Sequence, residues 1–409
     1  MNNFYANIEI IKEGKYMKHT LSQKFNRQVD QISVSLIRKF DEQVTNIDGI
    51  IKLTLGEPDF NTPEHVKQAG IQAIEENYSH YSGMSGLMDV RVAASEFFAK
   101  KYGLHYKPES EILVTIGATE AISASLLSIL EAGDKVLMPA PIYPGYEPII
   151  TLANAKPIYI DTSKNDFVLT PEMIDQAMVE HGDEVKAIIL NYPSNPTGVT
   201  YTREEVQKIA ESLKKYDIFV ISDEIYSELT YGGDHVSIAE FIPEQTILIN
   251  GLSKSHAMTG WRLGFILSNE AFIKELMKVH QYLVTAASTV SQKAAVKALT
   301  QGIDDGLEMR AEYQIRRDYV YQKMNDLGFS IARPNGAFYI FGKIPKGFNQ
   351  NSMEFCVDLA QKQALALIPG IAFGPEAEGY VRVSYAASME NLEKAMERLS
   401  NYMKAHPAQ

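Results

Sequence analysis

Lys254 lies in a short polar segment between two apolar runs, an arrangement that could make its amine reactive. Residues 246–250 form the first run and read as a buried strand, and the second run, which contains Arg262, reads as another strand. A lysine at the end of such a strand would be partly removed from water, which lowers its pKa and makes the amine nucleophilic toward carbonyl groups. Ser253 and Arg262 could hold an anion beside it, because the planar guanidinium suits phosphate. A solvated lysine without a chemical role is the other interpretation.

A turn of small residues supplies a second candidate anion site. Gly117, Ala118 and Thr119 join an expected strand, residues 112–116, to an expected helix, residues 121–130. Such a turn presents unpaired backbone N–H groups and the positive end of the helix dipole to an anion, although a plain strand-to-helix junction would read the same way. The pattern is neither G-x-G-x-x-G nor a Walker loop, so it does not indicate a dinucleotide or ATP.

Asp223 follows the apolar strand expected over residues 218–222. A carboxylate in that position is costly to bury unless it is paired. It could pair with a protonated ring nitrogen, and Tyr226, three residues later, could reach an oxygen of the same ring. The alternative is a metal site shared by Asp223, Glu224 and Glu228, but the sequence has no His or Cys cluster nearby to complete it.

Three further side chains are restricted by their sequence neighbours. Asn195 lies in the proline-containing segment 191–198, which either fixes its direction or simply forms a turn. Tyr143, in a proline-rich loop, could stack on an electron-poor ring or pack as a buried aromatic residue. Arg382 lies inside an expected strand, residues 380–385, where it requires an anionic partner from a ligand or from a structural ion pair.

The composition is typical of a globular enzyme with room for two domains. The chain has 409 residues, of which 45% are hydrophobic and 22% charged. Its net charge of −12 argues against a nucleic-acid or anionic-membrane partner. Cys356 is the single cysteine, which excludes an intrachain disulfide. No apolar run approaches the roughly 20 residues of a membrane span, and residues 1–16 lack a signal-peptide core, so we expect a cytoplasmic protein.

Hydrophobic periodicity predicts an α/β region followed by a smaller α+β region. Most candidate groups fall at the ends of the expected strands, where ligands bind in open α/β sheets. A helix is expected after Pro63 with Thr62 as its cap, and a capping box opens another at Thr202. The expected strands are residues 50–55, 112–116, 135–138, 156–160, 187–190, 218–222, 246–250, 337–341, 365–368 and 380–385. The later helices are residues 271–286, 290–302, 305–326, 352–362 and 389–403.

The pattern Ser-Lys-x-x-x-x-x-Gly-x-Arg-x-Gly, which begins at Ser253, resembles the lysine signature of the class I/II pyridoxal-phosphate aminotransferases of fold type I. The resemblance covers residues 30–403 and includes the motifs Asn-Pro-Thr-Gly, Asp-Glu-Ile-Tyr and Val-Arg-x-Ser. It implies a large domain with a mostly parallel sheet, a smaller α+β domain and pyridoxal 5′-phosphate as cofactor. The implied boundaries are an N-terminal extension at 1–16, an arm at 17–60, a large domain at 61–300 and a small domain at 301–409.

The resemblance also implies a role for each candidate residue. Lys254 becomes the Schiff-base lysine, and Asp223 the partner of the ring nitrogen. The phosphate is held by Ser253, Arg262 and the turn formed by Gly117, Ala118 and Thr119. The ring is held by Tyr143, which stacks on it, and by Asn195 and Tyr226, which bond its oxygen.

Substrate and partner contacts follow from the same resemblance. Arg382 is implied to clamp the substrate α-carboxylate, with Asn195 and the backbone of Gly56 beside it, although Gly56 could simply serve a turn. Tyr81 is implied to reach the cofactor phosphate of a partner subunit, which predicts a homodimer with shared active sites. A lone tyrosine in a glycine loop could instead be a packing residue.

Within the family the chain is most similar to bacterial aromatic and N-acetyl-LL-diaminopimelate aminotransferases, notably in residues 142–148 and 222–231. The segment 284–292 contains no arginine, which argues against the dicarboxylate specificity of aspartate-specific relatives. Glutamate with 2-oxoglutarate is the expected co-substrate pair of a ping-pong reaction. Two alternatives stay open: a carbon–sulfur β-lyase on the same fold, and a non-enzymatic cofactor-binding regulator.

Overall fold

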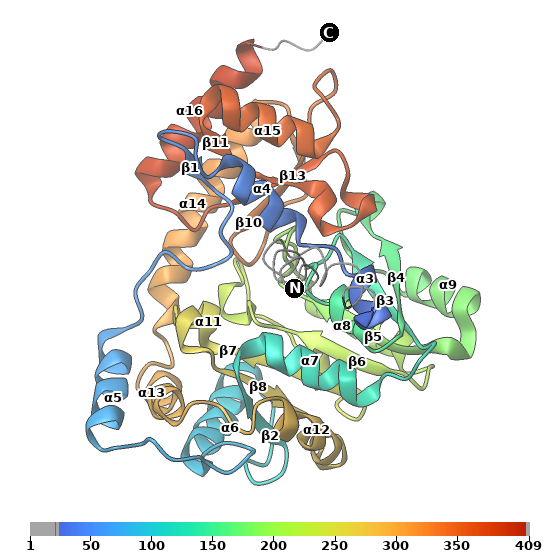
Figure 1. Cartoon of the computed structure of the whole chain (residues 1–409), viewed down its shortest axis with the longest axis vertical. Coiled ribbons are helices and arrows are strands. Elements are labelled where there is room, and N and C mark those ends of the chain that lie inside the picture. Colours follow the sequence, from blue (N-terminus) through green and yellow to red (C-terminus); the bar gives the residue numbers. More distant parts are fainter. Residues whose placement is uncertain (1–20, 22–23, 406–409) are drawn as a thin grey trace, which may run out of the picture.

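The computed structural model describes Leu21 and residues 24–405, so the proposed extension at residues 1–16 lies outside it. The described chain forms a large unit around one sheet and a smaller unit that packs against the large unit (Figure 1). Within these residues, no helix has the length and apolar character that crossing a membrane requires.

A seven-stranded sheet organises the large unit, in the order β2-β8-β7-β6-β5-β3-β4. All neighbours pair in parallel except those of β8, which runs antiparallel to β2 and β7. Residues 252–263 connect β7 to β8, which returns beside β7 in the opposite direction. The mostly parallel sheet predicted from the sequence is therefore confirmed. Its strands are β2 (Ile112–Thr115), β3 (Lys135–Ala140), β4 (Lys156–Asp161), β5 (Val185–Asn191), β6 (Phe219–Asp223), β7 (Thr246–Gly251) and β8 (Gly264–Leu267).

Helices cover both faces of this sheet. Successive strand residues point to opposite faces, so Ile188 packs beneath α9 and α10, whereas Ile189 packs with α7 and α12. Burial on both faces explains why these strands are continuous apolar runs without alternation. The helices are α5 (Glu64–Glu75), α6 (Met88–Tyr102), α7 (Gly117–Ile129), α8 (Glu147–Leu152), α9 (Pro171–His181), α10 (Arg203–Leu213), α11 (Leu252–Ser255), α12 (Glu270–Leu283) and α13 (Thr289–Thr300).

The smaller unit is built on a four-stranded antiparallel sheet in the order β12-β13-β10-β9, with a separate parallel pair, β1 and β11. Three helices flank these strands (Figure 1). The strands are β1 (Ile51–Lys52), β9 (Ser330–Ile331), β10 (Tyr339–Lys343), β11 (Leu365–Ala366), β12 (Ile368–Pro369) and β13 (Tyr380–Ser384). The helices are α14 (Gly306–Asp326), α15 (Ser352–Gln363) and α16 (Met389–Ala405).

Two strands predicted in this unit differ from those observed. The strand expected over residues 50–55 is reduced to β1, and Thr54 and Leu55, beyond β1, line a cavity between the units. The strand expected over 365–368 is divided into β11 and β12, which pair with different neighbours.

An N-terminal arm connects the two units. Its first helix, α3 (Arg27–Gln31), packs against α8, and its second, α4 (Leu36–Val44), packs against α15 and β12 (Figure 1). Phe40 and Val44 are buried in the core that α14, α15 and α16 share. This packing supports the proposal that the arm joins the small domain, and the proposed boundary at residue 300 falls at the end of α13.

The start of α5 corrects one sequence-based expectation. Thr62 does not cap this helix, whose N-cap position is occupied by Pro63. The Thr62 hydroxyl instead donates to the Ala257 carbonyl at 2.7 Å and accepts from Trp261 Nε1 at 3.2 Å. It therefore ties the start of α5 to the segment that follows Lys254. The capping box at Thr202 is confirmed.

Gly264 allows β8 to lie directly against the first turn of α7. A Cβ at this position would be 2.7 Å from the Gly117 carbonyl carbon and 2.8 Å from the Ala118 nitrogen. These are backbone atoms, so they cannot rotate away as a flexible side chain would. The close approach fixes where the N-terminus of α7 lies relative to the segment between β7 and β8.

Replacing Gly264 with alanine should lower the free energy of unfolding by about 1–3 kcal/mol, because the added methyl group overpacks a backbone contact. Denaturant unfolding followed by circular dichroism measures the change. Gly260→Ala is the matched control, since a Cβ there meets no atom within 4 Å. A Gly264→Ala protein as stable as that control would show that β8 and α7 do not need this contact.

Candidate active site

One cavity of about 420 Å³ lies between the two units, where β5, β6 and β7 end. Every candidate residue predicted from the sequence lines it except Gly117, which is adjacent, and Tyr81. The candidates in its wall are Gly56, Ala118, Thr119, Tyr143, Asn195, Asp223, Tyr226, Ser253, Lys254, Arg262 and Arg382.

Lys254 reaches this cavity from the short helix α11, directly after β7. Its amine donates a hydrogen bond to the Gly56 carbonyl at 2.5 Å and lies 5.7 Å from the ring centre of Tyr226 and 5.8 Å from that of Phe338. Burial among these groups lowers the pKa of Lys254 to about 8. A larger fraction of the amine is therefore neutral and nucleophilic near neutral pH than for a surface lysine.

Asp223, at the end of β6, faces the cavity with a side chain that is removed from solvent. The residue is 4% exposed, and its carboxylate accepts from the Tyr146 hydroxyl at 2.6 Å and from the Ile225 N–H at 3.2 Å. Burial raises the pKa of Asp223 to about 6, which leaves it mostly ionised at neutral pH. It forms no ion pair with any residue the structure describes. A buried carboxylate of this kind is suited to a cationic ligand.

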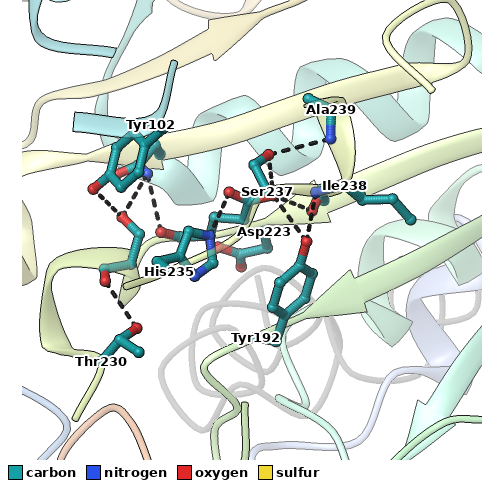
Figure 2. A network of polar contacts seen from close by, with 12 residues as sticks. Tyr102, Tyr192, Asp223, Thr230, His235, Ser237, Ile238 and Ala239 are labelled. Carbon is teal, nitrogen blue, oxygen red and sulfur yellow. Dashed lines mark hydrogen bonds and ion pairs between the residues drawn. The ribbon is translucent and has the colours of Figure 1, made fainter. Parts of the chain in front are cut away.

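A network of buried polar side chains holds the segment behind Asp223 (Figure 2). Glu224 turns away from the cavity and is engaged by four side chains, at 2.7–3.3 Å. These are Tyr192, Ser222, His235 and Ser237. The grouping of Asp223 with Glu224 as metal ligands is therefore not formed, and no metal-binding cluster of His, Cys, Asp or Glu occurs among residues 24–405.

Backbone and side-chain donors converge at the start of α7. Ile116 precedes this helix without a side-chain cap, so the first N–H groups are available to a ligand. Gly117 has φ +71°, which glycine adopts without strain, and a Cβ there would be 2.8 Å from Arg262 Nη2. Arg262 itself has φ +52°, an unfavourable conformation for a non-glycine residue. With Ser253 in the same wall, these donors form a site suited to a phosphate group.

Tyr143 contributes a half-buried ring to the cavity wall. It meets the ring of Tyr146 edge-on, with centroids 5.4 Å apart. The ring also lies close to Gly145, where any Cβ would collide with it. Gly145 is thus required for the position of this ring, a requirement that the sequence pattern did not indicate.

Arg382, on β13, is 2% exposed and has no carboxylate partner in the described chain. It donates to Asn195 Oδ1 at 2.9 Å and to the Thr54 carbonyl at 2.7 Å, while its Nε has no partner. The rings of Tyr339 and Phe373 lie 4.5 and 4.9 Å from the guanidinium carbon. A structural ion pair, the alternative from sequence, is therefore not present, and the geometry favours a ligand anion.

Two functional neighbours were missed in the sequence. The Tyr339 hydroxyl lies 2.7 Å from that of Tyr226, and a Cβ on Gly56 would be 2.8 Å from it. Gly56 is therefore required for a close approach as well as for a turn. The second is Tyr146, whose hydroxyl donates to Asp223. It lies in the proline-rich loop in which the sequence pattern singled out Tyr143 and not Tyr146. No local signal distinguishes either tyrosine, because both make their contacts with segments distant in sequence.

The aminotransferase class I and II family model matches residues 48–399. The chain belongs to this family. It is 47% identical, over 95% of its own length and 96% of the relative's, to a probable N-acetyl-LL-diaminopimelate aminotransferase of Bacillus subtilis. It is 37% identical to an aspartate aminotransferase of Pyrococcus abyssi, with 92% and 97% covered. An aromatic aminotransferase structure from Pyrococcus horikoshii superposes with a TM-score of 0.84 at 36% identity, with 90% and 99% covered.

This protein is accordingly a pyridoxal-phosphate-dependent aminotransferase of fold type I. Its cavity fits that cofactor in three independent ways. Donors at α7 and Arg262 suit the phosphate, the unpaired carboxylate of Asp223 suits a protonated ring nitrogen, and the amine of Lys254 suits the aldehyde.

Tyr81 is the one predicted site residue that lies away from the cavity, and it is 88% exposed. Its loop is anchored to the large unit through the Met84 carbonyl, which lies 2.9 Å from His280 Nε2. Its predicted reach into a partner's site stays a prediction.

In the cofactor-free aminotransferase, we expect Lys254 to react with an amine-labelling reagent at a rate that rises through about pH 8, because burial lowers its pKa to that value. Mass spectrometry of the labelled peptides measures the rate. Exposed Lys208, whose pKa is raised by its hydrogen bond with Glu204, is the internal control. If both lysines titrate together, the amine of Lys254 is not desolvated.

Proposed function

We propose that this aminotransferase moves an amino group from an L-amino acid to a 2-oxo acid by a ping-pong mechanism. The proposed substrate is of the N-acetyl-LL-diaminopimelate type, with glutamate and 2-oxoglutarate as the co-substrate pair. The relative that bears that name shares 47% identity over almost the whole chain, which supports this assignment. An aromatic amino acid is the second candidate, supported by the aromatic aminotransferase of similar fold.

The observation that carries the proposal is the position of Arg382. Its guanidinium is buried in the same cavity as the amine of Lys254, without a carboxylate from the described chain. A guanidinium binds a carboxylate through two parallel charge-assisted hydrogen bonds. An amino acid held in this way has its α-carboxylate fixed at one side of the cavity, so its α-amino group and Cα–H are held in a defined orientation toward Lys254.

Each remaining residue then has a defined task. Pyridoxal phosphate, when bound, supplies the aldehyde and the electron sink that the reaction requires. Lys254 acts as the base that takes the proton from the substrate Cα, helped by its lowered pKa. Asp223 holds the proton on the ring nitrogen through its charge. Asn195 has its amide nitrogen available to a ring oxygen, since its Oδ1 accepts from Arg382. Tyr226 donates to the same oxygen.

The substrate side chain is the less constrained part of the proposal. The relatives carry names that refer to N-acetyl-LL-diaminopimelate, aspartate and aromatic amino acids. Residues 284–292 contain no arginine to receive a short dicarboxylate side chain. This supports a longer substrate over aspartate.

We also propose a homodimer with active sites shared across its interface. Tyr81 is 88% exposed, so its ring is available to contact a partner subunit. The donors at α7 and Arg262 already form most of a phosphate site within one subunit. Tyr81 of one subunit would complete the site of the other.

A half-reaction screen tests the function. The cofactor-loaded protein is mixed with one amino acid at a time, without a 2-oxo acid, and the cofactor absorbance is followed. We expect N-acetyl-LL-diaminopimelate and glutamate to convert the cofactor fully to its amino form, because each has an α-carboxylate for Arg382. Lys254→Ala should remove steady-state turnover with both.

The products decide between the candidates. Release of the matching 2-oxo acid, with the amino group regained by 2-oxoglutarate, supports the proposal. Faster conversion by phenylalanine than by N-acetyl-LL-diaminopimelate would favour the aromatic assignment. Pyruvate and ammonia from cysteine conjugates, without amino transfer, would replace the proposal with a β-lyase. Wild-type turnover by Lys254→Ala would refute the assignment of the lysine.

A further inference from the structure

A second cavity, of about 730 Å³, adjoins the active-site cavity. Ile37 and Tyr143 line both, so the two spaces meet at these side chains. The second cavity lies between the arm and the large unit, bounded by residues 31–38 on one side and by α8 and the turn Gly370–Phe373 on the other. In Figure 1 the arm runs past this region from α3, beside α8, to α4.

The wall of the second cavity is mainly apolar and carries two charged residues. Most of its surface comes from aliphatic and aromatic groups, among them Ile32, Leu36, Met138, Ile142 and Phe373. The charged residues are Arg38 and Glu147. Glu147 accepts a hydrogen bond from the Tyr159 hydroxyl at 2.8 Å. Arg38 has no hydrogen bond or ion pair with any residue in the described part of the chain, so its guanidinium is available to a ligand.

Helix α4 holds Arg38 in place. Phe40 and Val44, on the same helix, are buried in the core of the small unit. Ile37, the residue before Arg38, lines the active-site cavity itself. An arginine on a helix anchored in this way is a defined part of the cavity wall, although its side chain is exposed.

The two arginines thus line adjacent cavities. A substrate whose α-carboxylate binds Arg382 would reach the second cavity by passing between Ile37 and Tyr143. The apolar wall suits a methylene chain, and the far guanidinium suits an anionic group at the end of that chain. A purely apolar side chain would make no use of this charge.

We propose that Arg38 is a specificity-determining residue, which binds a carboxylate at the far end of a long substrate side chain. The inference rests on the proposed function and deepens it, because the distal carboxylate is what separates a diaminopimelate-type substrate from an aromatic one. It also supplies the cation that residues 284–292 lack.

A matched pair of substrates tests this role. L-2-Aminoheptanedioate and L-2-aminoheptanoate have the same chain length and differ in the distal carboxylate alone. In Arg38→Gln, we expect kcat/KM for the diacid to fall by about two- to fivefold, because water weakens the ion pair that an exposed guanidinium makes. The loss should appear in KM, because Arg38 is remote from the reacting atoms. The value for the monoacid should be unchanged.

Two further variants complete the experiment. Lys39→Gln removes the same charge from the next residue, which is exposed and lines neither cavity, so it should leave the preference for the diacid intact. Arg38→Lys keeps the charge and should retain part of the preference.

Three outcomes would overturn the inference. One is an equal loss for both acids in Arg38→Gln, which would indicate a structural role. Another is a diacid preference that Lys39→Gln reduces as much as Arg38→Gln does, which would indicate general surface charge. The third is amino transfer from both acids by the wild type with no preference between them, in which case the aminotransferase assignment still stands. No amino transfer from either acid, in a protein whose cofactor glutamate still converts, would overturn the inference alone. Failure of glutamate and of N-acetyl-LL-diaminopimelate to convert the cofactor would overturn the proposed function as well.

Discussion

Buried charges without counter-charges are the feature on which the active site depends. Asp223 and Arg382 are almost fully removed from water, yet neither forms an ion pair with the described chain. Leaving a charge in this state costs several kcal/mol. The fold keeps them in separate walls of one cavity, where each is available to a ligand of opposite charge. This is the electrostatic arrangement that a cationic ring and a carboxylate-bearing substrate require.

The frame that holds these charges apart is rigid where it meets the cavity. Asp223 ends a central strand, and the network around Glu224 fixes the backbone immediately after it (Figure 2). Arg382 comes from the other unit, held between two aromatic rings on an antiparallel sheet. Only glycine fits at positions 264 and 145. Gly264 lets β8 lie against the phosphate donors of α7, and Gly145 leaves room for the Tyr143 ring in the same cavity wall. Because the cavity has walls from both units and the arm, their relative position determines the distance between the charges.

The sequence predicted the groups that lie at the ends of apolar strands, and it did so for a physical reason. Asp223 and Lys254 follow strands that are buried on both faces, so their position at the edge of the sheet is fixed by local pattern. Tyr339 and Tyr146 carry no such signal, since their roles arise from contacts between segments far apart in the chain. Thr62 shows the opposite case, a strong local capping signal overridden by a tertiary hydrogen bond to Ala257. The mostly parallel sheet and the family were confirmed, whereas the roles of the individual residues and the domain boundaries remain proposals.

The most direct test of this account is the unfolding free energy of Asp223→Asn, with and without pyridoxal phosphate. Burial raises the pKa of Asp223 from 3.8 to about 6, so the folded protein carries an uncompensated charge above about pH 6 and none below about pH 4. Without cofactor, the variant should be at least as stable as the wild type at pH 8, and this advantage should disappear toward pH 4. With cofactor, it should gain much less stability than the wild type. A variant that is less stable without cofactor, yet equally stabilised by it, would contradict the claim that this charge is kept for the cofactor ring.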